Sequence, residues 1–234
     1  MARPKSSIAD QLNAAQLAIS NTIADPAIQA AVAAYGFPAA KLTEAKKLYD
    51  AALAAVNAQS AAAGAQQDAS AALDKAGKSA HDAYQALARV ARAVTPKAGL
   101  AALGLEGAEP RDTAGFAAAA YTLFDNAGKQ AGLAAYGYDA ARLTAERAKI
   151  AAYDQANQKQ EAAKGAAQQS TRDQEAALKA LNAWTAQYIK IARVALRDKP
   201  QLLEKLGVAA RTSLTAAQRA GRKKAAETRA AKAG

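Results

Sequence analysis

The chain contains no cysteine and only one histidine, His81. The lack of cysteine excludes disulfides, thiolate metal sites and cysteine nucleophiles. One histidine cannot supply the paired Glu-x-x-His motifs of a di-iron bundle or the two-histidine motif of zinc hydrolases. The acidic residues are scattered, and no two of them have the pattern of a catalytic acid and base. We therefore expect a protein that is not an enzyme and that has no metal and no cofactor.

Long apolar runs are also missing. No stretch of about 18 strongly apolar residues exists to form a transmembrane helix. The first residues, MARPK, are not followed by the apolar core of a signal peptide. These absences predict a cytoplasmic protein without membrane insertion.

Bulky apolar residues are few, with three Phe, one Trp and one Met. Alanine supplies most of the 51% of residues that are hydrophobic. It is the best helix former because it has no side-chain entropy to lose, and it buries little surface. The composition therefore predicts an all-α protein of thin, closely spaced helix pairs rather than a broad globular core.

A string of residues recurs 101 positions later in the chain. Residues 34–43 read AYGFPAAKLT, and residues 135–144 read AYGYDAARLT. The same offset carries residues 90–92, VAR, onto residues 191–193, IAR. Shared alanine content does not explain a register kept over about 60 residues, because Tyr, Gly and Arg positions coincide. The sequence therefore predicts an internal duplication.

Apolar residues follow steps of three and four in both predicted copies. One seam runs through residues 73–94, and a heavier one, which includes Trp184, runs through residues 178–195. The facing seams start at Leu42 and Leu143, and both become polar toward a mid-segment glycine. Each copy is therefore predicted to pair two helical stretches along a seam that weakens at this glycine.

The mid-segment glycines are Gly64 and Gly165. We interpret them as the tips of helical hairpins, because glycine adopts turn conformations cheaply. One continuous helix of about 57 residues in each copy is the alternative that the sequence leaves open. Gly36 and Gly137 are expected to end the preceding helices in the left-handed conformation. The four long helices are predicted near residues 39–62, 66–95, 140–163 and 167–197.

The predicted fold is an antiparallel four-helix bundle built from two tandem helical-hairpin repeats. Short helices near residues 8–24, 27–35 and 113–135 are expected to cover one end. The predicted organisation is an N-terminal arm (1–7), a first helical repeat (8–107), a second helical repeat (108–210) and a basic, flexible C-terminal tail (211–234).

Positive charge gathers at the ends of a chain whose net charge is +11. The tail has seven bases and one acid, a net charge of +6. Two interpretations stay open: an arm that neutralises the phosphates of nucleic acid or another polyanion, or a solvated terminus that aids solubility. The tail has no aromatic residue to stack on single-stranded bases. The candidate contacts are Arg211, Arg219, Arg222, Lys223, Lys224, Arg229 and Lys232.

Two further arginines, Arg92 and Arg193, lie near the ends of the two long segments. A cation at the end of a helix complements the helix dipole and bonds the terminal carbonyls. The alternative interpretation is an anion site made by this symmetry-related pair.

The aromatic residues that flank Gly36 and Gly137 recur in both copies. They are Tyr35 with Phe37, and Tyr136 with Tyr138. Aromatic residues at helix junctions commonly pack into the core, so we expect them to plug a bundle end. A ligand pocket at that end is the alternative.

The Tyr-Gly-aromatic string, the mid-segment glycine and residues 191–207, IARVALRDKPQLLEKLG, follow one another along the chain. Together they resemble a group of uncharacterised bacterial helical proteins with duplicated, alanine-rich halves. The resemblance covers residues 30–210. It implies the duplicated helical fold, and it implies no functional residue, because no activity is assigned to the group.

The leading prediction is a non-enzymatic structural or scaffolding protein that self-associates. Duplicated bundles offer two similar faces, which suits repetitive association. The second prediction is association with nucleic acid through the tail. The third is a small-molecule carrier that uses the bundle interior or its aromatic end.

Overall fold

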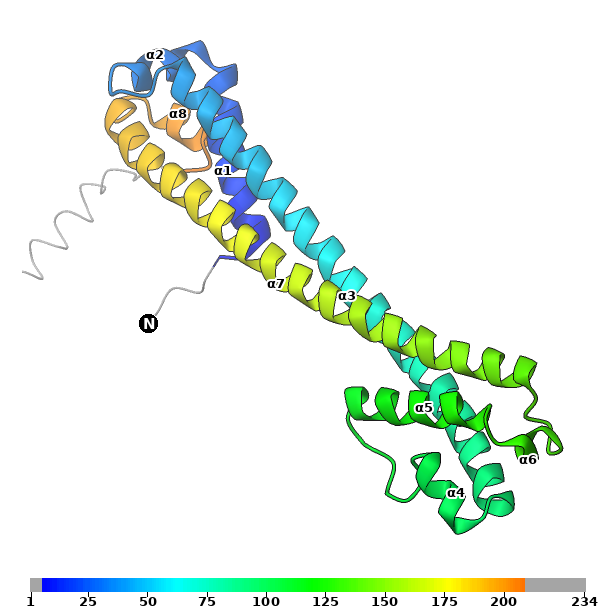
Figure 1. Cartoon of the computed structure of the whole chain (residues 1–234). Helices are drawn as coiled ribbons and strands as arrows, with labels where there is room; N and C mark the ends of the chain where they lie inside the picture. The colour runs from blue at the N-terminus through cyan, green and yellow to red at the C-terminus, as the bar shows by residue number, and fades with distance from the viewer. Residues whose placement is uncertain (1–5, 209–234) are drawn as a thin grey trace, which may run out of the picture. The chain divides into compact units, whose positions relative to one another are not determined.

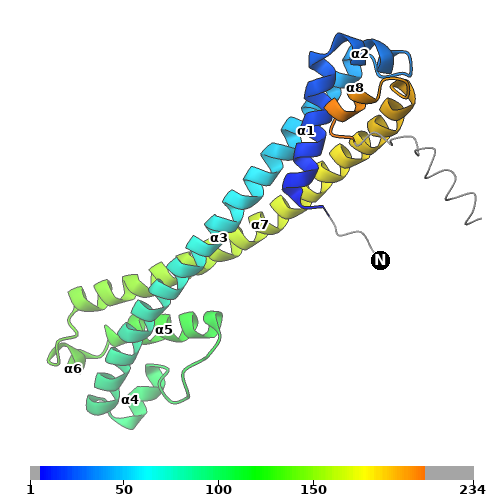
Figure 2. The same cartoon turned by 180° about the vertical axis from the view of Figure 1, so that it is seen from behind.

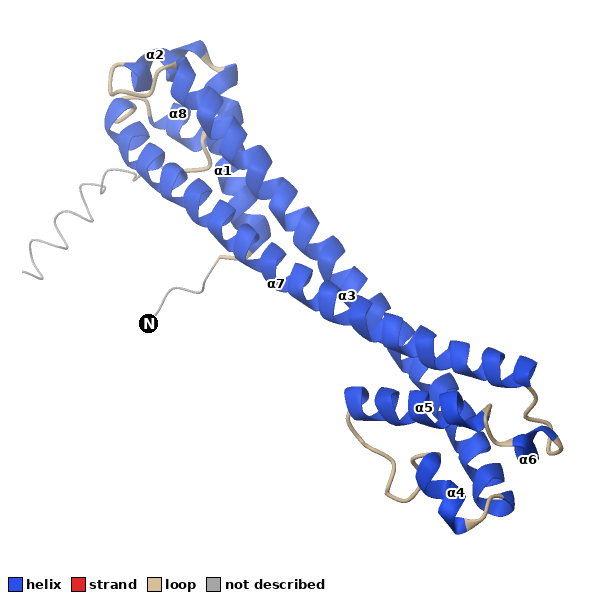
Figure 3. Ribbon diagram, in the orientation of Figure 1, coloured by secondary structure: helices blue, strands red, loops and turns tan. Residues whose placement is uncertain are grey.

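In a computed structural model that describes residues 6–208, the chain folds into helices joined by loops and turns (Figure 3). No strand occurs in this range, which confirms the all-α prediction. Figure 1 shows the helices in chain order. They are α1 (Ile8–Ala24), α2 (Pro26–Ala33), α3 (Ala39–Val94), α4 (Lys97–Ala102), α5 (Thr113–Ala127), α6 (Ala131–Ala134), α7 (Ala140–Ala195) and α8 (Pro200–Lys205).

Each long segment is one uninterrupted helix, so the predicted hairpins are wrong. Helices α3 and α7 have 56 residues each, and Gly64 and Gly165 lie inside them without a positive φ. A single glycine costs a helix only about 1 kcal/mol relative to alanine. The neighbours of both glycines are mainly strong helix formers, alanine and glutamine, and no proline or Asn-Gly pair offers a turn. The bundle of tandem hairpins is therefore corrected to two long helices connected and flanked by short ones.

Contacts divide the molecule into two compact units. Unit 1 holds the described residues within Met1–Ala54 and Ala176–Gly234, and unit 2 is Ala55–Glu175. These units differ from the predicted repeats, 8–107 and 108–210, because each unit takes in part of both long helices, with α1, α2 and α8 in unit 1 and α4, α5 and α6 in unit 2.

The predicted glycine helix ends are confirmed in both predicted copies. Gly36 and Gly137 both have a φ of 84°, the left-handed conformation that favours glycine. The next residues, Phe37 and Tyr138, donate their backbone N–H to the carbonyl five positions earlier, at 3.1 and 3.2 Å. This bond defines a Schellman helix end, in which the residue after the glycine turns back onto the core. Phe37 and Tyr138 are accordingly 4% and 3% exposed.

The other two aromatic residues of these strings do not pack as expected. Tyr35 is 50% exposed and Tyr136 is 59% exposed. Each precedes the left-handed glycine, and the Schellman turn directs the residue after the glycine inward instead. The expectation that all four aromatics plug a core is therefore wrong for Tyr35 and Tyr136.

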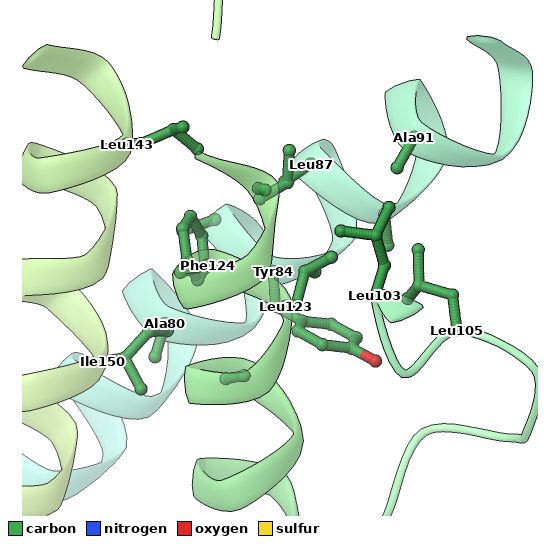
Figure 4. Close-up of a cluster of buried hydrophobic side chains, with 14 of the residues drawn as sticks. Ala80, Tyr84, Leu87, Ala91, Leu103, Leu105, Leu123, Phe124, Leu143 and Ile150 are labelled. Carbon is green, nitrogen blue, oxygen red and sulfur yellow. The ribbon is translucent and has the colours of Figure 1, made fainter. Parts of the chain in front are cut away.

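The core of unit 2 forms where α5 lies against the last turns of α3 and the first turns of α7 (Figure 4). The seam predicted along residues 73–94 supplies one side of it, which confirms that the late part of the seam is buried. Most of the buried side chains are small or aliphatic, as the composition predicts. The residues labelled in Figure 4 are Ala80, Tyr84, Leu87, Ala91, Leu103, Leu105, Leu123, Phe124, Leu143 and Ile150.

The core of unit 1 forms around the first turns of α3 and the last turns of α7. Helix α1 lies beside both of them, as Figures 1 and 2 show from opposite sides. Helix α8 closes the same core with Leu203 and Leu206. The fully buried side chains include Ile28, Val32, Tyr188 and Leu196.

Candidate functional site

The two arginines that the repeat relates belong to different units. Arg92 lies in the last turn of α3 and Arg193 in the last turn of α7, and both are exposed. Arg92 belongs to unit 2 and Arg193 to unit 1, so neither unit contains the predicted pair. Their positions suit the stabilisation of a helix C-terminus by a cation.

The candidate phosphate contacts of the tail, from Arg211 to Lys232, lie outside the described residues. Residues 1–5 of the N-terminal arm also lie outside them. Binding of a polyanion by the tail therefore stays a prediction.

The only histidine of the chain takes part in a polar and aromatic cluster in unit 2. Nδ1 of His81 lies 2.6 Å from Oε1 of Glu109, in the loop that precedes α5. The His81 ring stacks on Phe116 of α5, with 3.7 Å between ring centroids, and the ring of Tyr153 lies edge-on at 6.4 Å. The cluster ties α3 to the loop between α4 and α5. The sequence gives no sign of this partner, since Glu109 lies 28 residues away in a loop.

A hollow of about 320 Å³ opens beside this cluster, between the end of α3 and the same loop. Arg89 and Arg92 line it on the helix side, and Glu109 lines it on the loop side. Tyr84 lies at its base and is 4% exposed. Burial, with the negative charge of Glu109, raises the pKa of Tyr84, and the positive charge of Arg92 offsets part of this effect. The phenol therefore keeps its proton at neutral pH and is available as a hydrogen-bond donor.

Sequence reasoning named Arg92 and missed Arg89. The spacing of Arg89 and Arg92 could have identified Arg89, because residues three apart lie on the same face of a helix. The sequence does not predict the hollow itself, since the loop that lines one side of it contains no recognisable motif.

Unit 1 contains a second aromatic cluster. Trp184 and Tyr188 stack at 5.0 Å, and Phe37 meets both rings edge-on. The hydroxyl of Tyr188 hydrogen-bonds Thr22, whose own hydroxyl donates to the Ala18 carbonyl at 2.6 Å. Tyr188 and Thr22 are both fully buried. The hydrogen bond between Thr22 and Tyr188 joins α1 to α7.

The middle of the two long helices forms the third feature, which we call the uncovered helix pair: residues 55–76 of α3 and 154–173 of α7. None of these residues is buried. The two helices run antiparallel here, because Ala63 and Ala167 line a shared hollow of about 250 Å³ while Gly77 faces Tyr153. The whole stretch belongs to unit 2. Within residues 6–208, no residue of this pair is buried by a third element, so the two long helices lie side by side there.

Two kinds of site are absent from residues 6–208. No group of three or more His, Asp or Glu side chains in this range is placed to hold a metal ion. No helix in the same range combines the length and the apolar character needed to cross a membrane.

Comparison of the chain with family models, curated proteins and solved structures finds no match. The resemblance to duplicated bacterial helical proteins therefore stays a prediction.

Proposed function

We propose that the chain is a non-enzymatic scaffolding protein that self-associates, and that two copies meet at the uncovered helix pair. The observation that carries the proposal is the burial pattern of unit 2. Where α5 lies over the two long helices, Ala80, Tyr84 and Ile150 are buried. Along the uncovered helix pair, no residue is buried. Two helices alone withdraw little apolar surface from water, so this stretch gains stability when further helices cover it.

The charge of the surface favours a second copy of the same chain as the occupant. The uncovered helix pair has five acids and four bases, a net charge of −1, within a chain of net charge +11. Two strongly positive chains repel one another over most of their surfaces. The uncovered helix pair is nearly neutral and has charges of both signs interspersed. Two chains therefore approach one another there with the least electrostatic repulsion.

The dimensions also suit a dimer. A stretch of 22 helical residues is about 33 Å long, and two helices side by side are about 20 Å wide. Two such surfaces in contact bury about 1,300 Å² in total, which falls within the range of stable protein interfaces.

The exposed face of α3 suggests how two copies align. Ala58, Ala61, Ala65 and Ala72 are all exposed and follow steps of three, four and seven along one face. Small side chains allow two helix backbones to approach closely. In a two-fold dimer each residue of a contact recurs in the partner, so Ala65, midway between Ala58 and Ala72, is expected to lie on the axis.

The first experiment is light scattering by the full chain over a wide range of concentration. A concentration-dependent dimer or larger assembly is expected, and Ala65→Glu should weaken the association about tenfold or more, because it places two like charges together at the axis. A strict monomer at high concentration would overturn the proposal.

Cross-linking gives a positional test, since the chain has no cysteine of its own. Ala65→Cys should form an interchain disulfide readily under mild oxidation. Ser60→Cys is the matched control, because Ser60 is exposed on another face of the same stretch. Equal cross-linking by both variants would show random collision and contradict the proposed axis.

The alternative function, nucleic-acid association through the tail, is favoured by the tail's net charge of +6. It predicts DNA binding that weakens steeply with salt and is lost when residues 211–234 are deleted. Equal retention of DNA by the full and truncated chains would exclude the tail's role.

A further inference from the structure

The hollow at the end of α3 combines features that the scaffolding proposal does not use. It lies in unit 2, has a volume of about 320 Å³ and is open to solvent on one side. That volume is at the lower end of the range of small-molecule sites in proteins. Its charged lining residues are Arg89, Arg92 and Glu109.

The two arginines are placed to share one ligand. Arg89 and Arg92 are three positions apart on α3, so both guanidinium groups reach the same side of the helix. Neither forms an ion pair with any carboxylate among residues 6–208, and Arg89 has only a long bond of 3.4 Å to the side-chain oxygen of Gln85. A guanidinium has five N–H donors in a planar fork that fits carboxylate and phosphate oxygens. The helix dipole accounts for one cation in the last turn, but it does not account for a second arginine aimed into the same hollow.

The loop side of the hollow supplies hydrogen-bonding groups opposite the two arginines. One carboxylate oxygen of Glu109 is held by His81, at 2.6 Å. The carboxylate therefore has a fixed position and a remaining oxygen that can accept a hydrogen bond. Figure 4 shows the hydroxyl of Tyr84 directed away from Phe124, toward the turn between Leu103 and Leu105. The exposed residues Gly107 and Ala108 also line this side of the hollow.

We propose that this hollow is a binding site for a small ligand that carries an oxyanion group, carboxylate or phosphate, and a hydrogen-bond donor such as an ammonium group. Arg89 and Arg92 bind the oxyanion. Glu109 accepts from the donor, and it discriminates against ligands that have an oxyanion alone because its own charge repels them. The site is independent of self-association, since none of its residues belongs to the uncovered helix pair.

The chain offers its own reporters for a titration of the full-length protein. His81 is the only histidine and contacts Glu109, so its imidazole NMR signals report on the hollow. Trp184 is the only tryptophan and lies in unit 1, so its indole signal is the internal control. The probes are two matched pairs: phosphoethanolamine with ethyl phosphate, and β-alanine with propionate. Saturable shifts of the His81 signals are expected with at least one ammonium-bearing probe, and its partner without the ammonium should bind about tenfold more weakly. The pair that responds assigns the oxyanion as phosphate or carboxylate.

Three variants decide whether the named residues carry the binding. Arg89→Gln and Arg92→Gln should each weaken it about tenfold or more, since each removes a charge-assisted bond. Glu109→Gln should abolish the advantage of the ammonium-bearing probe. Arg193→Gln is the matched control, because Arg193 has the same place in the last turn of α7 and is exposed. All four positions are on the surface or partly exposed, and unchanged circular dichroism checks that the variants are folded.

Two results would overturn the proposal. The first is the absence of any saturable shift of His81 with all four probes at concentrations up to about 50 mM, which corresponds to negligible affinity. The second is an equal loss of binding in Arg193→Gln and Arg92→Gln, which would show general attraction of anions to a positive chain.

Discussion

The ring of Tyr153 on α7 closes over the bare backbone of Gly77 on α3. A Cβ atom at Gly77 would lie 3.2 Å from Cε2 of Tyr153, which is tighter than an ordinary van der Waals contact. Tyr153 is 7% exposed and is held by Phe116, at 5.7 Å between ring centroids, so its ring has little room to move. Gly77 therefore serves the close approach of α3 and α7 in unit 2. Gly64 and Gly165 differ, because a Cβ atom at either position would meet nothing within 4 Å.

This difference predicts opposite effects of alanine at the three positions. Gly64→Ala and Gly165→Ala should each stabilise the chain by about 0.5–1 kcal/mol, because alanine has less conformational entropy to lose in a helix. Gly77→Ala should stabilise the chain less than these two substitutions do, or destabilise it, since the ring of Tyr153 must move by a few tenths of an ångström. Urea unfolding followed by circular dichroism measures all three. If Gly64 were instead a left-handed hairpin residue, Gly64→Ala would destabilise the chain, so this result also tests the continuity of α3.

The long helices show how far the sequence predicts the fold. The glycine positions after which α3 and α7 begin follow from local chemistry, because only glycine reaches the left-handed conformation cheaply. Whether the chain turns at Gly64 does not follow from local chemistry alone. An isolated glycine costs about 1 kcal/mol within a helix, and the sequence does not show what packs around it. A seam that becomes polar near Gly64 is compatible with the approach to a hairpin tip, but in the structure it marks the stretch where none of the described residues is buried.

The candidate site shows a different limit. Arg92 and Arg193 hold matching places in the repeat, which leaves a shared anion site as the alternative to helix-end stabilisation, and the two residues belong to different units. The partners of Arg92 in the hollow are Arg89, one turn away, and Glu109, in a loop without regular structure. Arg89 can be predicted from helical spacing. The position of Glu109 cannot, because it depends on how the loop folds back onto α3.

The buried hydroxyl pair of unit 1 predicts a non-additive effect on stability. Thr22→Val leaves the hydroxyl of Tyr188 buried without a partner, which should cost about 1–3 kcal/mol. Tyr188→Phe should cost less, about 0.5–1.5 kcal/mol, because Thr22 keeps its bond to the Ala18 carbonyl. The double variant should cost less than the sum of the two, since neither polar group is then stranded. Strict additivity in urea unfolding would contradict a hydrogen bond between these side chains.

The same tyrosine predicts a loss of stability at alkaline pH. Burial raises the pKa of Tyr188, and the hydrogen bond with Thr22 offsets part of this effect. The folded state therefore holds the phenol proton more tightly than the unfolded state does. This contribution is fully present below the unfolded value, about pH 10, and is lost as the pH rises through the folded pKa. Tyr188→Phe should reduce the alkaline fall of the unfolding midpoint, whereas Tyr35→Phe, at an exposed position, should leave it unchanged.

An ion pair on unit 2 predicts the corresponding loss at acid pH. The hydrogen bond from Arg147 holds the pKa of Asp125 below its usual value, and the positive charges of Arg147 and Lys129 act in the same direction. The folded state therefore favours the carboxylate, and this contribution is present above the unfolded value, about pH 4. It is lost as the pH falls through the lowered folded pKa.

Asp125→Asn tests this contribution through the unfolding midpoint, measured by circular dichroism from about pH 7 to pH 2. The variant should be less stable than the natural chain at neutral pH, and the difference should vanish at the acid end, where both chains are neutral at this position. Asp82→Asn is the matched control, because Asp82 is exposed and forms no ion pair among residues 6–208. A constant difference between Asp125→Asn and the natural chain over the whole range would mean that the Arg147 contact stabilises the fold by packing rather than by charge.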